Sequence, residues 1–479
     1  MEKHTLEELT AVLAPCGQTH LLRFWNQLSP EQRDRLGDQI HAIDWPQVTQ
    51  WIHAALSDAG TTAIPFDRLT PAPYVSLKPE NAADATQLAE ARAAGEALLR
   101  AGKVACFTVA GGQGTRLGYD APKGTYCFSP LRNKSLFQYF AEAILRNQEK
   151  YDTTLPWYIM TSPANHADTI RFFEQNQFFG LLPANVRFFI QGTLPGFGMD
   201  GKALLEAPGS LALFANGHGG TFAALRDSGT LDDLEKRGVD YLAYWQVDNP
   251  MVTVCDPLFI GLHHLTDSEM SSRCLIKRDA MEKLGHFTLL DGKLNIVEYS
   301  DMPKELLERR DADGRLTFRP GSPAIHILSR QFIQRLTQNG AFALKPHRAN
   351  KKISYVDENG ALVKPAAPNG IKLEFFIFDA LPLATHPLIL EADRAEEFAA
   401  IKNAEGNDSP DSCRAALLER TVRWLEQAGV TVPRKADGTP DATIEISLRR
   451  AVCAEDVAEL VQAGQIPRSF APGAQFALD

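Results

Sequence analysis

The stretch from Val104 to Gly124, VACFTVAGGQGTRLGYDAPKG, is the part of the sequence that most strongly defines the fold. It begins with a nearly continuous apolar run over residues 104–110, which predicts a central strand buried on both faces. Three glycines follow at once, and glycine lets the backbone turn sharply and bring its N–H groups close to a bulky anion. Arg116 and Lys123 place two positive charges beside this turn. Strand, glycines and cations together predict a cradle for a polyphosphate.

Two well-known phosphate loops differ from this stretch. The P-loop needs Gly-Lys-Ser/Thr at the start of a helix, whereas Lys123 precedes Gly124 in a turn marked by proline. The dinucleotide fingerprint needs an acidic residue about 20 residues beyond its glycines. The next clear strand, Trp157–Thr161, ends in threonine and serine instead. The alternative interpretation is a tight strand-to-helix turn whose charges are incidental.

Composition indicates a soluble globular protein. With 479 residues, the chain is long enough for a large core and two or three structural units. The net charge of −10 argues against non-specific binding to nucleic acid or anionic membranes. Seven cysteines without CxxC spacing indicate reduced thiols. There is no signal-peptide core and no apolar run of transmembrane length. We therefore expect a cytoplasmic protein with no nucleic-acid or membrane partner.

The order of the expected elements predicts an α/β fold. Residues 1–56 are predicted to be helical, with helix-start signals at Ser29 and Asp44, and residues 57–79 to form an extended surface connection. Helical and strand patterns then alternate, which predicts a mostly parallel sheet with a ligand site at the carboxyl ends of its strands. The segments expected in this alternation are a helix over 84–100, a strand over 104–110, a helix over 135–150, a strand over 157–161, a helix over 165–178 and a strand over 186–190.

Three parts of the chain are expected. They are a helical N-terminal unit with its linker over residues 1–95, a central sheet domain over 96–385 and a small C-terminal α+β domain over 386–479. Within the central domain, residues 285–303 predict a hairpin that turns at Asp291-Gly292 and from which Glu298 emerges.

A carboxylate follows a second buried strand. The apolar run Tyr241–Val247 ends in Asp248 and Asn249. An unpaired carboxylate at the end of a central strand is costly to bury, and Mg²⁺, which prefers oxygen ligands, would compensate it. An aspartate that caps the following turn is the alternative. The residues by themselves leave both interpretations open.

The loop pattern GGxGTRLGxxxPKG resembles the signature of sugar-nucleotide pyrophosphorylases. The resemblance extends to the segment HLLRFWNQL near the N-terminus, to PNGIK within residues 355–382, and to the KNA motif that begins at Lys402. These motifs are most similar to the branch that contains the eukaryotic UDP-N-acetylglucosamine pyrophosphorylases. The resemblance implies a Rossmann-like sheet of the nucleotidyltransferase type A kind. It also implies an enzyme that makes a UDP-sugar and pyrophosphate from UTP and a sugar 1-phosphate.

The resemblance further implies roles for individual residues. Cations that neutralise the phosphates are expected to be Arg116, Lys123 and Lys402. Nucleotide-binding residues are expected to be Gly111, Gly112, Gly114, Thr115, Gln191 and Gly217. Sugar-binding residues are expected to be His218, Asn249, Gly285, Glu298 and Ser322. The expected metal ligand is Asp248, which would hold Mg²⁺ or Mn²⁺.

Two of these positions depart from the family pattern. The N-acetylglucosamine enzymes have asparagines where this chain has His218 and Ser322. A histidine in the second glycine turn is similar to that of glucose-1-phosphate uridylyltransferases and of broad-specificity UDP-sugar pyrophosphorylases. The resemblance therefore favours N-acetylglucosamine 1-phosphate as the substrate and leaves glucose 1-phosphate and broad specificity as alternatives.

Two hypotheses from other classes remain. A dinucleotide-binding oxidoreductase would share the strand and the glycines, but it would need the ribose-binding acid that is missing here. A catalytically silent protein that binds UDP-sugars would share the fold, although retention of Arg116, Lys123, Asp248 and Lys402 disfavours it. We expect a monomer or a weak homo-oligomer.

Overall fold

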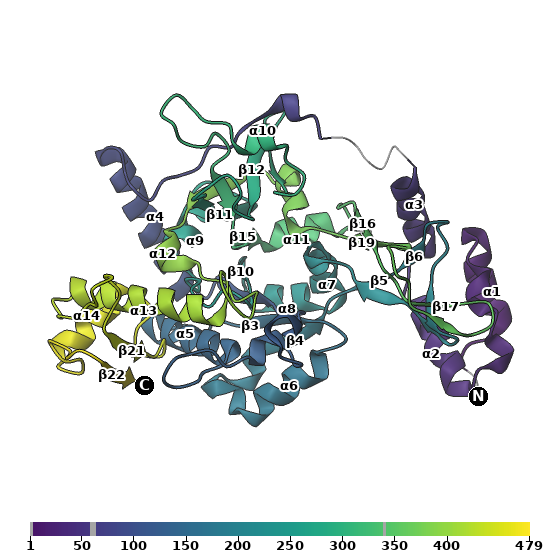
Figure 1. The fold of residues 1–479 in the computed structure, drawn as a ribbon, viewed down its shortest axis with the longest axis horizontal. Coiled ribbons are helices and arrows are strands. Elements are labelled where there is room, and N and C mark those ends of the chain that lie inside the picture. The colour runs from purple at the N-terminus through teal and green to yellow at the C-terminus, as the bar shows by residue number, and fades with distance from the viewer. Residues whose placement is uncertain (1–2, 58–63, 339–341) are drawn as a thin grey trace. The chain divides into compact units, whose positions relative to one another are not determined.

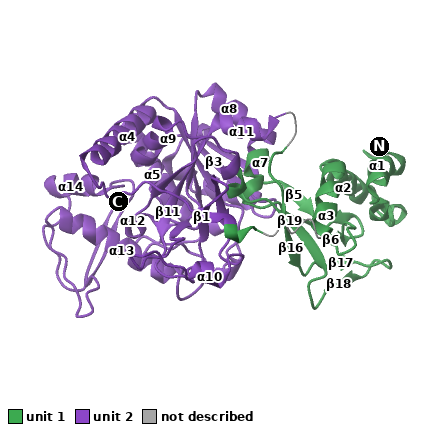
Figure 2. Cartoon of the chain, turned by 90° about the horizontal axis from the view of Figure 1, so that it is seen from above, with its two compact units in different colours: residues 1–67, 191–224, 341–380 green, residues 68–190, 225–340, 381–479 purple. Residues whose placement is uncertain are grey.

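The computed structural model describes residues 3–57, 64–338 and 342–479. Within them the chain forms two compact units, each assembled from segments that are far apart in the sequence (Figure 2). Unit 1 comprises residues 1–67, 191–224 and 341–380, and unit 2 comprises residues 68–190, 225–340 and 381–479. The division of the chain at residues 95 and 385 stays a prediction.

Unit 2 is built on one large sheet. Among the described residues, eleven strands belong to it, and the main order is β1-β12-β14-β11-β15-β10-β2-β3-β4 (Figure 1). The expected α/β class is confirmed. The four strands at one end, β10, β2, β3 and β4, are parallel to one another, and the strands beyond β15 extend the sheet in largely antiparallel fashion. The bounds of the parallel strands are Val104–Val109 for β2, Trp157–Thr161 for β3, Val186–Ile190 for β4 and Tyr241–Gln246 for β10.

The parallel strands lie where the apolar runs predict them. Every residue of β3 is buried, and so are the first five of β2, as expected for strands covered on both faces. Helix α5 (Leu136–Tyr151) contributes to the same core. Helices α4 (Ala82–Arg100) and α9 (Pro257–Leu265) approach each other closely at Gly95 of α4 and Gly261 of α9. A Cβ on Gly95 would lie 1.8 Å from a backbone oxygen of α9, so this contact requires glycine.

Helix α6 is shorter than predicted. It spans His166–Gln175, whereas the apolar periodicity predicted a helix to Phe178. Gln177, Phe178 and Phe179 adopt positive φ angles of 50°, 52° and 54°, which ends the helix. The aromatic rings of Phe178 and Phe179 pack against Phe173 instead, so aromatic packing overrides the helical pattern.

The antiparallel part of the sheet contains the predicted hairpin. Strands β12 (Gly285–Leu290) and β13 (Lys293–Val297) are joined by a two-residue turn at Asp291 and Gly292, both with positive φ. The segment predicted as a connection over residues 57–79 contains one short strand, because Leu69–Pro71 forms β1 and pairs with β12. The remaining strands of this part are β11 (Met270–Ile276), β14 (Pro320–Ser322), β15 (His326–Ser329) and β20 (Leu388–Glu391).

Unit 1 combines helices from the N-terminal segment with strands from two later segments. Its helices are α1 (Leu6–Leu13), α2 (Pro30–His41) and α3 (Trp45–Leu56). The predicted helix start at Ser29 is confirmed as a capping box with Gln32, and Asp44 caps α3 through the N–H of Gln47. Three of its strands, β16 (His347–Lys351), β19 (Gly370–Glu374) and β6 (Phe197–Gly198), form one small antiparallel sheet. Its other strands pair two by two, as β5 (Thr193–Pro195) with β9 (Leu213–Ala215), β7 (Leu205–Ala207) with β8 (Ser210–Leu211), and β17 (Tyr355–Val356) with β18 (Leu362–Val363).

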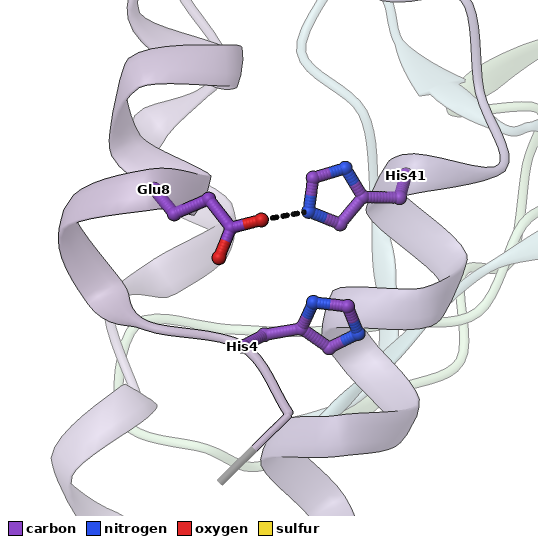
Figure 3. Close-up of side chains that lie close together, drawn as sticks. All are labelled: His4, Glu8 and His41. Atoms are coloured by element: carbon purple, nitrogen blue, oxygen red, sulfur yellow. Dashed lines mark ion pairs between the residues drawn. The ribbon is translucent and has the colours of Figure 1, made fainter.

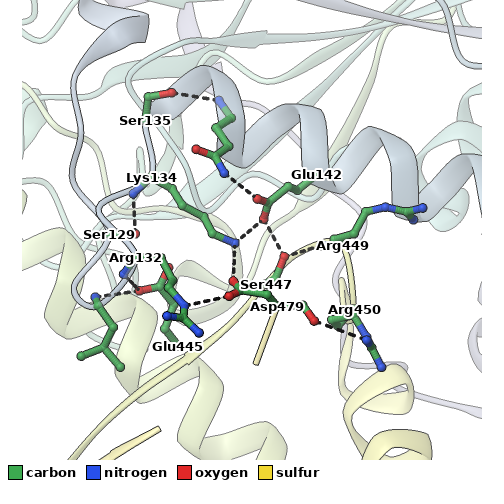
Figure 4. A network of polar contacts seen from close by, with 12 residues as sticks. Ser129, Arg132, Lys134, Ser135, Glu142, Glu445, Ser447, Arg449, Arg450 and Asp479 are labelled. Atoms are coloured by element: carbon green, nitrogen blue, oxygen red, sulfur yellow. Dashed lines mark hydrogen bonds and ion pairs between the residues drawn. The ribbon is translucent and has the colours of Figure 1, made fainter. Parts of the chain in front are cut away.

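The C-terminal part of unit 2 has an apolar core of its own. Its elements are α13 (Pro410–Gln427), β21 (Ala442–Ile446), α14 (Ala454–Gln462) and β22 (Ala474–Leu478). Polar contacts connect it to α5 and to the residues before that helix (Figure 4). The Lys134 ammonium lies 2.8 Å from Glu142 and 3.4 Å from Asp479, and the Ser447 hydroxyl donates to Glu142. The buried Lys134–Glu142 pair belongs to the sheet region, and the Ser447 hydroxyl and the exposed Asp479 carboxylate join the C-terminal elements to it.

None of the described helices is long and apolar enough to cross a membrane.

Candidate functional site

The glycine-rich loop that follows β2 is closed by its own backbone. The N–H of Lys123 donates to the carbonyl of Gly112 at 3.1 Å, and the N–H of Gly114 donates to Ala121 at 3.0 Å. The side-chain amide of Asn165, which is fully buried, donates to the carbonyls of Ala110 and Gly112. The loop is therefore held in one conformation from inside the protein.

The glycines of this loop differ in what surrounds them. A Cβ on Gly112 would meet no atom within 4 Å, so its outer face is open. A Cβ on Gly124 would lie 2.1 Å from the ring of Phe137, so Gly124 is needed for packing. Among the described residues, no backbone carbonyl accepts a hydrogen bond from the N–H groups of Gly111, Gly112 or Gln113. Such N–H groups beside an open surface can bind an anion.

Asp248 lies beside Lys123 of this loop. Strands β2 and β10 pair in parallel, with Val109 opposite Gln246, so the residues after both strands meet at the same edge of the sheet. The Lys123 Nζ atom is 3.8 Å from the Asp248 Oδ2 atom, and the exposed fractions of the two side chains are 17% and 14%. A carboxylate and an ammonium group thus face each other at the carboxyl ends of parallel strands.

The segment that contains Lys402 is fixed to the same edge. The N–H of Ile401 donates to the Asp248 carbonyl at 2.8 Å. The side-chain amide of Asn249, which is 3% exposed, donates to the carbonyl of Glu397 and accepts from the N–H of Ala399. Three hydrogen bonds to backbone groups of residues 397, 399 and 401 therefore hold this segment against the end of β10. Lys402 follows directly and is half-buried.

Thr115 and Arg116 lie in a short 3₁₀ turn, Thr115–Leu117, and both are exposed. The turn ends at Gly118, whose φ of +67° is in the left-handed region that favours glycine. Arg116 is thus an exposed cation a few residues from the open face of Gly112.

Three residues expected to contact a sugar lie together in the antiparallel part of the sheet. Gly285 of β12 and Ser322 of β14 face each other in register. A Cβ added to Gly285 would lie 3.4 Å from a carboxylate oxygen of Glu298, so the carboxylate covers this glycine. The structure brings together these three residues, which are distant in the sequence. Asn249 is the fourth expected sugar-binding residue in unit 2. Its side-chain amide is hydrogen-bonded to the backbone of residues 397 and 399.

Unit 1 contains the other three expected residues. Gln191 follows β4 and is 8% exposed. Gly217 has a φ of +83°, and a Cβ there would lie 2.4 Å from the carbonyl oxygen of Phe375, so only glycine is compatible with this turn.

His218 is held as a neutral imidazole. Its Nδ1 atom accepts a hydrogen bond from the N–H of Ile377 at 3.1 Å, and its ring stacks on Phe376 with centroids 5.5 Å apart. Burial lowers the pKa of His218 to about 4. Because Nδ1 is the acceptor, the ring proton is on Nε2, and His218 can donate one hydrogen bond from that atom.

Sequence reasoning missed Asn165. The predicted helix start there is confirmed, because Asn165 is the N-cap residue of α6, but the support that its side chain gives to the glycine-rich loop was not predicted. A signal was present, since an asparagine four residues after the end of β3 lies at the carboxyl edge of a parallel sheet. Polar residues there are candidates for supporting a ligand site.

The chain is similar to known proteins along most of its length. The family model described as UTP–glucose-1-phosphate uridylyltransferase matches residues 54–454. The human UDP-N-acetylhexosamine pyrophosphorylase-like protein 1 is 38% identical over 88% of this chain and 86% of its own. The UDP-N-acetylglucosamine pyrophosphorylase of Saccharomyces cerevisiae is 34% identical over 92% of this chain and 94% of its own.

The solved structures include a similar fold along nearly the whole chain. The uridine diphosphate N-acetylglucosamine pyrophosphorylase of Trypanosoma brucei, in complex with an inhibitor, superposes with a TM-score of 0.81 at 26% identity, and the match covers 99% of this chain and 98% of that one. With a family model that spans most of the sequence and relatives that align along almost all of it, the chain belongs to the UTP–glucose-1-phosphate uridylyltransferase family.

Proposed function

We propose that the chain is a uridylyltransferase that joins UTP to N-acetylglucosamine 1-phosphate and releases pyrophosphate. The observation that supports this most directly is the placement of Lys123, Asp248 and the Lys402 segment beside an open glycine-rich loop. The names of the human and yeast relatives support the acetamido sugar.

The chemistry needs positioned charges more than a protein nucleophile. A phosphate oxygen of the sugar 1-phosphate attacks the α-phosphorus of UTP, and the bond from that phosphorus to the β-phosphate oxygen breaks. The attacking oxygen is already anionic, so the main obstacle is repulsion between two phosphorylated substrates. Two unit charges 4 Å apart repel by about 4 kcal/mol at an effective dielectric constant of 20. Lys123, Arg116 and Lys402 would reduce this repulsion and align the phosphates.

We propose Mg²⁺ or Mn²⁺ as the cofactor, with Asp248 as its ligand from the protein. Among the described residues, no group of three metal-binding side chains includes Asp248. A single carboxylate suits Mg²⁺, which commonly completes its coordination with substrate phosphates and water. The ion would supply additional positive charge to the phosphates when bound.

Glucose 1-phosphate is a second candidate substrate. The description of the matching family model supports it, and so does His218, which offers a single Nε2–H donor in place of the asparagine of the acetamido-sugar enzymes. We also propose that the protein works in the cytoplasm as a monomer or weak homo-oligomer. The seven cysteines are free in the structure, which suits a reducing compartment.

The decisive experiment is pyrophosphate release from UTP in the presence of Mg²⁺ with four substrates in parallel. These are the 1-phosphates of N-acetylglucosamine, N-acetylgalactosamine, glucose and galactose. We expect the highest kcat/KM with N-acetylglucosamine 1-phosphate. Preference for glucose 1-phosphate would overturn the sugar assignment and leave the reaction intact, while no release with any sugar would overturn the enzyme assignment.

A further inference from the structure

Two histidines and a glutamate lie close together in unit 1, outside the residues expected to bind substrate (Figure 3). His4 precedes α1, Glu8 lies in its first turn, and His41 ends α2. One donor atom from each of the three lies within 4.8 Å of the other two. The His41 Nε2 atom is 3.0 Å from the Glu8 Oε1 atom. Among the described residues, this is the only such group of three histidine, cysteine, aspartate or glutamate side chains.

His4 is oriented by its other neighbours. Its Nε2 atom is 2.7 Å from the Asp38 Oδ1 atom, so Nδ1 is the ring nitrogen that remains for another partner. In Figure 3 one ring nitrogen of His4 points toward Glu8 and His41. Metal-binding histidines usually donate their second ring N–H to a carboxylate, which fixes the ring and strengthens the ligand. Asp38 is placed to do this.

Packing also fixes the position of His4. The residue is 7% exposed. A Cβ on Gly37 would lie 2.3 Å from the His4 ring, so the ring rests directly on the backbone of α2. This close approach requires glycine at position 37. Thus His4 is held in place without a metal, as expected of a site that forms before its ligand arrives.

The other two side chains are reachable from solvent. The exposed fraction is 47% for Glu8 and 37% for His41, so an ion can enter and both side chains can adjust. In a tetrahedral Zn²⁺ site with bond lengths near 2.0 Å, neighbouring ligand atoms are about 3.3 Å apart. The Glu8 and His41 ligand atoms, 3.0 Å apart, already have about this spacing. The ligand atom of His4 lies within 4.8 Å of both, so a small movement of the exposed side chains would complete the site.

We propose that His4, Glu8 and His41 bind one Zn²⁺ ion. Two imidazole nitrogens and one carboxylate oxygen are ligands that Zn²⁺ accepts, with water as the fourth. Asp38 acts as a positioning residue through the His4 ring. The bound ion joins the start of α1 to the end of α2, which gives it a structural role in unit 1. This inference is independent of the proposed uridylyltransferase activity.

Isothermal titration calorimetry tests the site. Zn²⁺ alone is titrated into the full-length protein after bound metal has been removed. We expect one ion per chain for the wild type. Glu8→Gln and His41→Gln should each weaken binding at least about 10-fold. His53→Gln is the matched control, because His53 is an exposed histidine in the last turn of α3 and belongs to no described cluster. It should bind as the wild type does.

Two further readouts separate a specific site from loss of folding. Zn²⁺ should raise the Tm of the wild type and of His53→Gln, and at the same concentration it should raise the Tm of His41→Gln by less, since stabilisation grows with the ratio of ligand concentration to Kd. Co²⁺ in place of Zn²⁺ should give the visible absorption of a four-coordinate centre, and that absorption should be lost in His41→Gln. Failure of the wild type to bind Zn²⁺ at 100 times the protein concentration would overturn the proposal. Unchanged affinity in Glu8→Gln and His41→Gln would overturn it as well.

Discussion

The proposed role of Lys123 can be tested by replacing it with methionine, which keeps the length of the side chain and removes its charge. At 4 Å and an effective dielectric constant of 20, one ammonium group attracts one phosphate charge by about 4 kcal/mol. Part of this attraction is already used in the free protein, because Lys123 lies 3.8 Å from Asp248. The net loss should therefore resemble that of one preorganised donor, about 2.7–4 kcal/mol, or 10²- to 10³-fold in kcat.

The structure provides a matched control at the other end of the same strands. Lys103 precedes β2 and lies 3.2 Å from Asp240, which precedes β10. Lys103→Met removes an equivalent lysine–aspartate pair from the same pair of parallel strands, but at the edge opposite the loop. Its kcat should stay within about twofold of the wild type, because exposed ion pairs contribute little.

Pyrophosphate release at saturating UTP and N-acetylglucosamine 1-phosphate measures kcat, and urea unfolding confirms that both variants fold. Lys123→Met should lose about 1–3 kcal/mol of stability, since it leaves the Asp248 carboxylate, which is only 14% exposed, without its ammonium partner. If Lys123→Met is fully folded and its kcat is within threefold of the wild type, Lys123 does not neutralise the reacting phosphates. Equal losses of kcat in both variants would show that the effect comes from the strands and not from the site.

Two other predictions concern the support of the site, and a third concerns His263, a buried histidine of α9 whose ring contacts Ser271 and Ser329. Asn249→Leu leaves the backbone groups of residues 397 and 399 without partners, so urea unfolding should show a loss of about 1–3 kcal/mol per group and kcat should fall about 10- to 100-fold. Gly112→Ala should raise the KM for UTP with stability unchanged, whereas Gly124→Ala, which collides with Phe137, should lower the melting temperature. Burial lowers the pKa of His263 from 6.5 to about 3, so the unfolded state binds more protons between these values. Stability should then fall as the pH falls below about 6.5, by up to about 1.4 kcal/mol per pH unit, and His263→Gln should show a slope shallower by that amount in unfolding measured at several pH values.

The parallel strands could be predicted because each is a short run of mostly apolar residues. Trp157–Thr161 and Val186–Ile190 have the bounds that the apolar runs predict. Both are short, mostly apolar runs with clear bounds, although only β3 is buried along its whole length, whereas β4, the last strand of the sheet, ends in the exposed Ile190. The strand β1 was missed because three residues carry little pattern, and its pairing with β12 joins segments far apart in the sequence.

The interleaving of the two units could not be predicted either. Residues 191–224 and 341–380 leave the sheet region and join the N-terminal helices. Nothing in the local periodicity of these segments says which core they enter, because apolar residues pack equally well in either. The cluster of His4, Glu8 and His41 was missed for a related reason, since α1 and α2 bring the two histidines together only through tertiary packing.

The placement of Asp248 beside Lys123 depends on register, which the sequence leaves open. A slip of one residue between β2 and β10 would turn the side chains after β10 to the opposite face. The register is held by backbone along the whole pair of strands, from the carbonyl of Lys103, which accepts from the N–H groups of Asp240 and Tyr241, to the carbonyl of Val109, which accepts from the N–H of Val247. These are backbone bonds, so Lys103→Met leaves them intact. Backbone pairing thus sets the register, and this register places Lys123 and Asp248 at the same edge of the sheet, whereas the Lys103 side chain at the opposite edge has no part in it.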